Sequence, residues 1–514
     1  MSLPHASPDS KSPSALRKGL QEPAGYGLRQ WSGWLLGPLC LIITLLLPPP
    51  DGLSVEGWRT AGVALLMATF WICEPIPIPA TALLPLVLLP LLGLATGKEA
   101  AAPYANPIIY LFLGGFFIAA AMQRWGLHRR LALQLIAAMG TRPRNIIAGF
   151  LLSAALLSMW VSNTATALMM LPIALSVTQL LPSEGPHATE HRSFATALLL
   201  AVAYGATTGG MATLIGTPPN ALLAGYMGNV YGQEIGFGQW MLIGLPVTLI
   251  ALPIVWVVLT RISFRLGREP VVGMADLLKR ERSQLGPLRR GEAMVAVVFC
   301  LTAMAWVFRP LLGEVIPGIS DTLIAITGAL LLFMLPVSLK EGSFALDWQS
   351  AKAVPWDVLL LFGGGLSLAG MVETHGLSQY LGGLSASLGA LPVVFTLAVL
   401  CFGILMLTEL TSNTATAATF LPVMAALAIS LGQNPLLFLV PAALAANCSY
   451  MMPVGTPPNA IVFGSGNITL PQMARAGLWL NLLLVPLLLT VVLLLGHWVF
   501  GVELGVVPDW AAGR

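Results

Sequence analysis

The amino-acid sequence predicts an all-α polytopic membrane protein with about eleven transmembrane helices, two re-entrant hairpins and an inverted-topology repeat. Three observations lead to this fold class. The chain has 514 residues, of which 56% are hydrophobic and 9% are charged, whereas soluble domains carry roughly 25% charged residues. Long apolar runs recur along the chain. The motif Ser-Asn-Thr-Ala-Thr-Ala begins at Ser162 and again, 250 residues later, at Ser412, both times inside such a run.

The expected helices follow from the lengths of these runs. Crossing the hydrocarbon core of a bilayer takes about 20 apolar residues in a helix. Two runs, 195–228 and 436–465, are interrupted by Gly-Thr-Pro-Pro-Asn but are long enough to cross. The uninterrupted runs are 33–49, 57–73, 78–95, 107–123, 241–264, 292–310, 320–337, 356–372 and 476–500.

The basic residues predict the orientation. With the N-terminus in the cytoplasm, most of the 25 Lys and Arg residues fall on the cytoplasmic side, as the positive-inside rule requires. Segment 146–182 has basic residues on both flanks, so we expect it to enter from the cytoplasm and return. Segment 393–431 has no basic residue close by, so we expect it to enter from outside. We expect the C-terminus to lie outside as well. The basic residues left outside are Arg59, Lys98, Arg309 and Arg514.

The repeat extends beyond the two hairpins. At the same offset of 250, Phe112 matches Phe362 and Ser158 matches Thr408. Gly216-Thr-Pro-Pro-Asn recurs from Gly455, at an offset of 239. Inverted repeats with interrupted helices are typical of secondary transporters. The expected organisation is a disordered cytoplasmic tail (1–30), scaffold helices (31–106), repeat 1 (107–240), scaffold helices with a basic cytoplasmic loop at 265–290 (241–355), repeat 2 (356–475), and a last helix with an outside tail (476–514).

The residue types exclude several function classes. The five cysteines are scattered singly, so neither a disulfide framework nor a zinc site is indicated. No GxxxxGK[ST], HExxH or GxSxG motif is present. We therefore expect neither an enzyme nor an organic cofactor, and no nucleic-acid partner. A channel would need a continuous polar path, whereas here polarity is confined to one depth.

The repeated motifs have a chemistry of their own. Proline interrupts a helix, which frees carbonyl oxygens for a cation and exposes N–H groups for an anion. Ser158 and Thr408 lie one turn before the two hairpin tips, so their hydroxyls face the same side as the tips. A single Ser-Asn-Thr could equally be a helix cap or a hydrogen bond between helices. Glu409 is an intramembrane carboxylate and so a functional candidate, but its repeat counterpart is Met159, which favours a structural role.

These motifs resemble one known family. The doubled Ser-Asn-Thr, the doubled Gly-Thr-Pro-Pro-Asn and Trp71-Ile-Cys-Glu-Pro-Ile-Pro-Ile-Pro closely resemble the divalent-anion/sodium symporter family of dicarboxylate and citrate carriers, over about residues 30–505. The resemblance implies a homodimer that transports its substrate by an elevator mechanism. It also implies a location in the lipid bilayer of the bacterial inner membrane. It implies sodium ions near Ser158, Ser162, Asn163 and Gly216 and near Thr408, Thr411, Asn413 and Gly455. It implies substrate carboxylates at Asn163, Thr164, Thr217, Asn413, Thr414 and Thr456.

The resemblance leaves the transport reaction open. We expect sodium-coupled symport of di- or tricarboxylates such as succinate, malate or fumarate, with Na⁺ as the co-transported ion. The family also contains sodium-independent exchangers and sulfate carriers. Bacterial sulfate carriers often have an added soluble domain, which this sequence lacks, and this favours carboxylates.

Overall fold

The structure is a computed structural model that describes residues 26–181, 188–384 and 391–512. This part is helical apart from one two-stranded antiparallel ribbon, β1 (Pro336–Ser338) and β2 (Ser343–Phe344). Seven of its helices are long and apolar enough to span a membrane. The helical membrane fold is therefore supported, whereas the count of eleven crossings stays a prediction. Most of the expected tail, residues 1–25, lies outside the described residues.

The helices before the first repeat differ from the expectation at one place. The single helix predicted over 78–95 is wrong, because this stretch forms two short helices. Pro85 lies in the first turn of the second one and has no N–H to continue the preceding helix. The elements are α1 (Leu28–Leu46), α2 (Val55–Cys73), α3 (Ile78–Thr81), α4 (Leu84–Leu91), α5 (Gly97–Ala101) and the 3-10 helix η2 (Ala102–Ala105).

The first repeat continues with a long helix, a pair of 16-residue helices and a broken helix. We call α8 and α9 the first helix pair, and residues 211–217 the first break. The elements are α6 (Pro107–Trp125), α7 (Leu127–Met139), α8 (Pro143–Ser158), α9 (Asn163–Thr178), α10 (Ala188–Gly210), α11 (Pro218–Tyr226) and the π-helical turn η3 (Met227–Tyr231).

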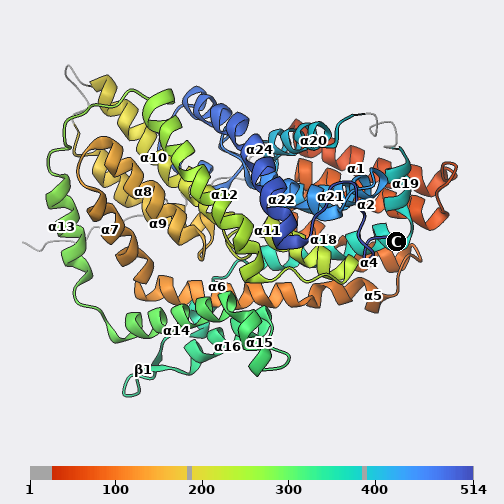
Figure 1. The fold of residues 1–514 in the computed structure, drawn as a ribbon, viewed down its shortest axis with the longest axis horizontal. Coiled ribbons are helices and arrows are strands. Elements are labelled where there is room, and N and C mark those ends of the chain that lie inside the picture. The colour runs from red at the N-terminus through yellow and green to blue at the C-terminus, as the bar shows by residue number, and fades with distance from the viewer. Residues whose placement is uncertain (1–25, 182–187, 385–390, 513–514) are drawn as a thin grey trace, which may run out of the picture.

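Part of the segment between the repeats packs along α6. Figure 1 shows α14, α15 and α16 beside α6, at the lower edge of the molecule. The predicted basic loop 265–290 contains a helix of its own, α13. The elements are α12 (Phe237–Val257), the π-helical turn η4 (Val258–Ser263), α13 (Met274–Leu285), α14 (Arg290–Val307), α15 (Arg309–Val315), α16 (Asp321–Met334) and α17 (Trp348–Ala351).

The second repeat has the same order of elements. The helices α8 and α20 have equal lengths and begin 250 residues apart, as do the starts of α9 and α21. We call α20 and α21 the second helix pair, and residues 448–456 the second break. The elements are α18 (Trp356–Thr374), α19 (Leu377–Leu384), α20 (Val393–Thr408), α21 (Asn413–Ser430), α22 (Pro435–Asn447), α23 (Pro457–Phe463) and the final helix α24 (Leu470–Phe500).

Two equivalent residues of the repeats touch each other. The rings of Phe112 on α6 and Phe362 on α18 have centroids 5.0 Å apart and are nearly perpendicular. This is a favourable edge-to-face contact, and both side chains are fully buried. The contact joins α6 and α18 at equivalent positions of the two sequence repeats.

The first break has its backbone groups satisfied by nearby side chains. The Asn220 amide donates to the carbonyl oxygens of Gly210, Met211 and Thr213, the last at 2.8 Å. The Thr213 hydroxyl in turn donates to the Met159 carbonyl at the tip of the first helix pair, at 2.5 Å. Non-helical backbone at membrane depth is tolerated only when such partners exist. The break and the tip are therefore held together.

The second break uses a carboxylate for the same purpose. Glu409 lies at the tip of the second helix pair and is 3% exposed. Its two oxygens accept hydrogen bonds of 2.7 to 3.0 Å. These hydrogen bonds give Glu409 a structural role, because they fix the backbone of the second break to the tip. The donors are the backbone N–H groups of Tyr450, Met451 and Met452 and the side chains of Ser449 and Asn481.

Replacing Glu409 by glutamine should destabilise the protein. One carboxylate oxygen becomes an amide nitrogen that faces N–H donors, so buried donors lose their acceptor, at a cost of about 1–3 kcal/mol or more. We expect Glu409→Gln to lower the melting temperature of the purified protein in detergent. The control is Glu341→Gln in the exposed turn between β1 and β2. Equal melting temperatures for the two variants would contradict the anchoring role.

Candidate functional site

The first helix pair and the first break bring four polar atoms together. Ser158 ends α8 and is fully buried, and Asn163 begins α9. One end of the Asn163 amide lies 2.5 Å from the Ser158 hydroxyl, 3.2 Å from the Gly216 carbonyl oxygen and 3.3 Å from the Ala206 carbonyl oxygen. We call these four residues the first cluster. Three of the four sequence-predicted sodium ligands of repeat 1 thus meet in space.

The second repeat builds the same arrangement. Thr408 ends α20 and is fully buried, and Asn413 begins α21. One end of the Asn413 amide lies 2.7 Å from the Thr408 hydroxyl, 3.2 Å from the Ala446 carbonyl oxygen and 3.3 Å from the Gly455 carbonyl oxygen. These four residues are the second cluster. The hydroxyl residue, the asparagine and the glycine of each cluster lie at matched positions of the sequence repeat. The fourth member, the carbonyl of Ala206 or Ala446, comes from a helix outside the repeated motifs.

Each cluster offers its central amide two orientations. With its nitrogen inward, the amide donates to all three surrounding oxygens. With its oxygen inward, it completes a group of four oxygen atoms in which only the hydroxyl has a proton to donate. Such a group is electrostatically unfavourable unless a cation lies among the oxygens. The geometry therefore suits a small hard cation, which takes oxygen ligands.

Glycines make the first cluster compact. A Cβ atom on Gly210 would lie 2.7 Å from the Asn163 amide oxygen, and one on Gly216 would lie 2.4 Å from the Gly210 carbonyl oxygen. Both distances are too short for a side chain, so the backbone of the break approaches the tip only because these positions are glycine. The Gly216 in the repeated motif thus has a packing reason as well as a carbonyl to offer.

Asn447 connects the second cluster to Thr217 and Asn220, which lie beside the first cluster. The Thr217 hydroxyl donates to its amide oxygen at 2.7 Å, and its amide nitrogen donates to the Asn220 amide oxygen at 3.0 Å. Its own carbonyl accepts from Asn413 at 3.4 Å. Sequence reasoning did not select Asn447, although a single amide in the apolar helix α22 was an available signal. Ala206 and Ala446 contribute backbone carbonyls, and an alanine side chain does not indicate such a role in the sequence.

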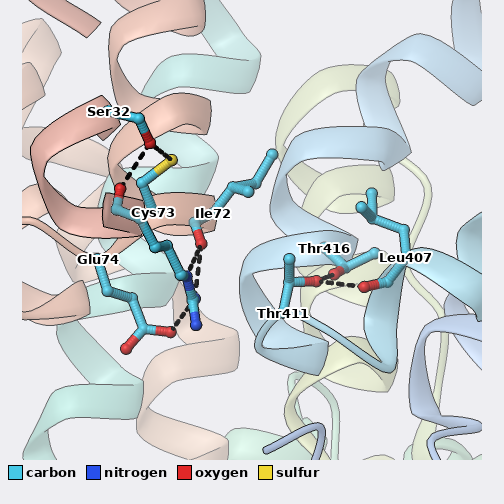
Figure 2. A network of polar contacts seen from close by, with 8 residues as sticks. Ser32, Ile72, Cys73, Glu74, Leu407, Thr411 and Thr416 are labelled. Carbon is cyan, nitrogen blue, oxygen red and sulfur yellow. Dashed lines mark hydrogen bonds and ion pairs between the residues drawn. The ribbon is translucent and has the colours of Figure 1, made fainter. Parts of the chain in front are cut away.

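The other predicted residues lie around the clusters. Ser162 caps α9 and accepts from the Ala165 N–H at 3.3 Å. The Thr411 hydroxyl donates to the Leu407 carbonyl at 3.0 Å and lies 2.7 Å from the Thr416 hydroxyl, as Figure 2 shows. The structure thus directs the hydroxyls of Ser162 and Thr411 to neighbouring helix groups. Thr164 is half-buried, and Thr414 and Thr456 are buried near the starts of α21 and α23.

The charge of the site limits its chemistry. All eight cluster residues are neutral, and the described part of the chain has no group of three His, Cys, Asp or Glu side chains that could hold a metal ion. The arrangement lacks an acid–base pair or an activated nucleophile in the clusters. It can hold cations through oxygen atoms and an anion through amide, hydroxyl and backbone N–H donors.

Two relatives named as transporters match nearly the whole chain. The chain is 43% identical to the sodium-dependent dicarboxylate transporter SdcS of Staphylococcus saprophyticus over 491 residues, which covers 94% of each chain. It is 42% identical to the SdcS protein of Staphylococcus aureus strain NCTC 8325 over 486 residues, covering 93% of this chain and 94% of that protein.

The fold and the family follow from two further comparisons. The crystal structure of the Alcanivorax borkumensis YdaH transporter superimposes with a TM-score of 0.53 at 16% identity, covering 92% of this chain and 98% of the other. The model of the sodium:sulfate symporter transmembrane region matches residues 29–502. This match spans nearly the whole chain, so the protein belongs to the sodium:sulfate symporter transmembrane family of integral membrane transporters.

Proposed function

We propose that this chain is a secondary active transporter that couples sodium entry to the uptake of di- or tricarboxylates such as succinate, malate or fumarate. The observation that carries the proposal is the pair of equivalent oxygen clusters at the two tips. Asn447 bonds to Asn413 of the second cluster and to Thr217, which follows Gly216 of the first. The relatives in both Staphylococcus species are named sodium-dependent dicarboxylate transporters, which supports both the ion and the substrate class.

Each cluster holds one sodium ion in this proposal. The Ser158 or Thr408 hydroxyl, the amide oxygen of Asn163 or Asn413 and the freed carbonyl of Gly216 or Gly455 are the ligands. Ser162 and Thr411 complete the sites after a local rotation of their side chains. Rotation of the central amide from nitrogen-inward to oxygen-inward opens each cluster for its ion.

The substrate binds between the two sodium ions. Its carboxylates accept hydrogen bonds from Asn163, Thr164 and Thr217 on one side and from Asn413, Thr414 and Thr456 on the other. A dianion in a neutral pocket loses several kcal/mol of hydration free energy, and two adjacent cations restore it. Substrate affinity therefore depends on sodium, which is the physical basis of coupling.

The transport cycle is of the elevator type in this proposal. The two helix pairs are re-entrant hairpins of opposite orientation, and they move with the substrate against scaffold helices that hold a homodimer together. The N-terminus lies in the cytoplasm and the C-terminus outside, in the bacterial inner membrane. The distribution of basic residues supports this orientation.

Two alternatives lead to different measurements. A sodium-independent exchanger would use the same clusters as hydrogen-bonded packing. A sulfate symporter would match the description of the family model. The discriminating experiment is uptake of radiolabelled succinate into proteoliposomes, with and without an inward sodium gradient and with citrate, malate and sulfate as competitors. We expect accumulation only with the gradient and competition from malate more than from sulfate. Uptake that ignores sodium but requires internal carboxylate would establish the exchanger.

Removing the cluster hydroxyls should weaken sodium dependence specifically. Ser158→Ala and Thr408→Ala each delete one ligand of a buried cation, and we expect the half-saturating sodium concentration to rise roughly tenfold. Selectivity among carboxylates should change little. Thr408→Ser keeps the oxygen and should stay close to the unmodified protein. Ser153→Ala is a matched control, because this buried hydroxyl on α8 donates to Ala132 outside the cluster. An unchanged sodium dependence in both alanine variants would remove the sodium assignment.

The inverted repeat predicts opposite accessibility for equivalent residues. Arg142 and Pro392 are 250 positions apart, are both exposed, and cap the N-termini of α8 and α20. In a cysteine-free background, we expect Arg142→Cys to react with a membrane-impermeant maleimide only from the cytoplasmic side, and Pro392→Cys only from the outside. Reaction of both from one side would show that the repeats have the same orientation.

A further inference from the structure

A cavity of about 280 Å³ lies between the start of α9 and the last turn of α6, where Arg124 lies. Ser162, at the start of α9, lines one side of it. Gln123 and Arg124 from the last turn of α6 line another side, together with Ser350 from α17. Because Asn163 of the first cluster directly follows Ser162, an anion that leaves the candidate site toward this end of α6 has this cavity next to it.

Arg124 is a cation with unused hydrogen-bonding capacity. Its Nη1 atom lies 2.8 Å from Asp347 Oδ2, and its guanidinium carbon lies 5.7 Å from the centre of the Trp125 ring. Within the described part of the chain, this Nη1 atom is buried, and its contact with Asp347 lacks hydrogen-bond geometry. A guanidinium group pairs best with a carboxylate that accepts two parallel hydrogen bonds. The present ion pair does not supply that geometry.

The ion pair with Asp347 is easily exchanged. The two side chains are 24% and 46% exposed, and ion pairs at such positions contribute little net free energy. Asp347 also has a partner of its own, because the Ser350 N–H donates to its Oδ1 atom at 2.8 Å. This backbone hydrogen bond lowers the pKa of Asp347, and the charge of Arg124 acts in the same direction. The Asp347 carboxylate therefore stays ionised, and it stays bonded to the Ser350 N–H, when Arg124 turns away.

We infer that this cavity is a second, transient binding site for the transported anion, in which a substrate carboxylate replaces Asp347 on Arg124. The inference rests on the proposed function, since it takes the transported ion to be an organic dianion. Gln123 and Ser350 add hydrogen-bond donors at the cavity wall. A dianion that has left the neutral candidate site finds a cationic partner here before it reaches water. This cavity lies on the side of the protein where the basic residues gather.

A purely structural ion pair makes a different prediction. If Arg124 and Asp347 only tie α6 to the segment before α17, loss of either side chain breaks the same contact and has the same effect. In a transient anion site the two residues oppose each other, because Asp347 competes with the substrate for Arg124. Opposite effects of the two substitutions therefore distinguish the two roles.

The test is succinate efflux from proteoliposomes with the α6 basic end facing the lumen, measured against the luminal succinate concentration. We expect Arg124→Gln to raise the half-saturating luminal concentration about tenfold and Asp347→Asn to lower it. External half-saturation for succinate and sodium should stay within about twofold in both variants. Equal shifts in one direction for both variants, or shifts of equal size on both sides of the membrane, would overturn the inference.

Two further variants keep the test decisive if Arg124→Gln folds poorly. Gln123→Glu adds a negative charge to the cavity wall and leaves the ion pair in place, so it should also raise the luminal half-saturating concentration. Arg124→Lys keeps the charge but not the planar donor pair and should lie between Arg124→Gln and the unmodified protein. No effect of Gln123→Glu would count against the site. Failure of the proposed function itself is seen separately, as absence of sodium-driven uptake by the unmodified protein.

Discussion

The need to satisfy backbone groups at two helix breaks organises this protein. Inside a bilayer, an unpaired N–H or C=O has no water to bind, so interrupted helices persist only with partners from the protein. Asn220 supplies donors to the carbonyls of the first break, and Thr213 of that break donates to its tip. Glu409 at the second tip accepts from the N–H groups of the second break. The positions of the clusters follow from these contacts.

The two repeats solve this common problem with different residues. In repeat 1 a side chain of the break, Thr213, reaches a backbone carbonyl of the tip, at Met159. In repeat 2 a side chain of the tip, Glu409, reaches backbone N–H groups of the break. The repeats thus keep equivalent geometry at Asn163 and Asn413 although their supporting contacts have diverged. The carboxylate faces the break and not the cluster, which leaves the clusters neutral.

Neutral clusters have a consequence for selectivity and rate. A pocket with fixed positive charges would bind a dianion without any cation and release it slowly, whereas neutral oxygens and amides bind it well only when cations are present. A cation that acts on the anion is better placed outside the pocket, where binding is brief. Arg124 has that position: it lines the cavity beside Ser162, and its partly exposed pairing with Asp347 is weak enough to be exchanged.

The sequence alone was enough for the features that depend on residue type and spacing. The doubled motifs located the tips at Ser162 and Ser412 and the breaks before Pro218 and Pro457, because proline and glycine act on the backbone locally. The recurrence of both motifs, at offsets of 250 and 239 residues, indicated the repeat, and the first offset pairs Phe112 with Phe362. The same local rule holds at 78–95, where Pro85 separates α3 from α4 although the length of the apolar run predicts one helix.

Only the tertiary structure decided which atoms converge. The carbonyls of Ala206 and Ala446 enter the clusters through the packing of α10 and α22 against the tips, and an alanine backbone has no signature in a sequence. Asn447 meets Thr217 across a separation of 230 residues, and Arg124 meets Asp347 through the packing of α6 beside α17. Such contacts depend on how distant helices dock, which residue spacing along the chain does not specify.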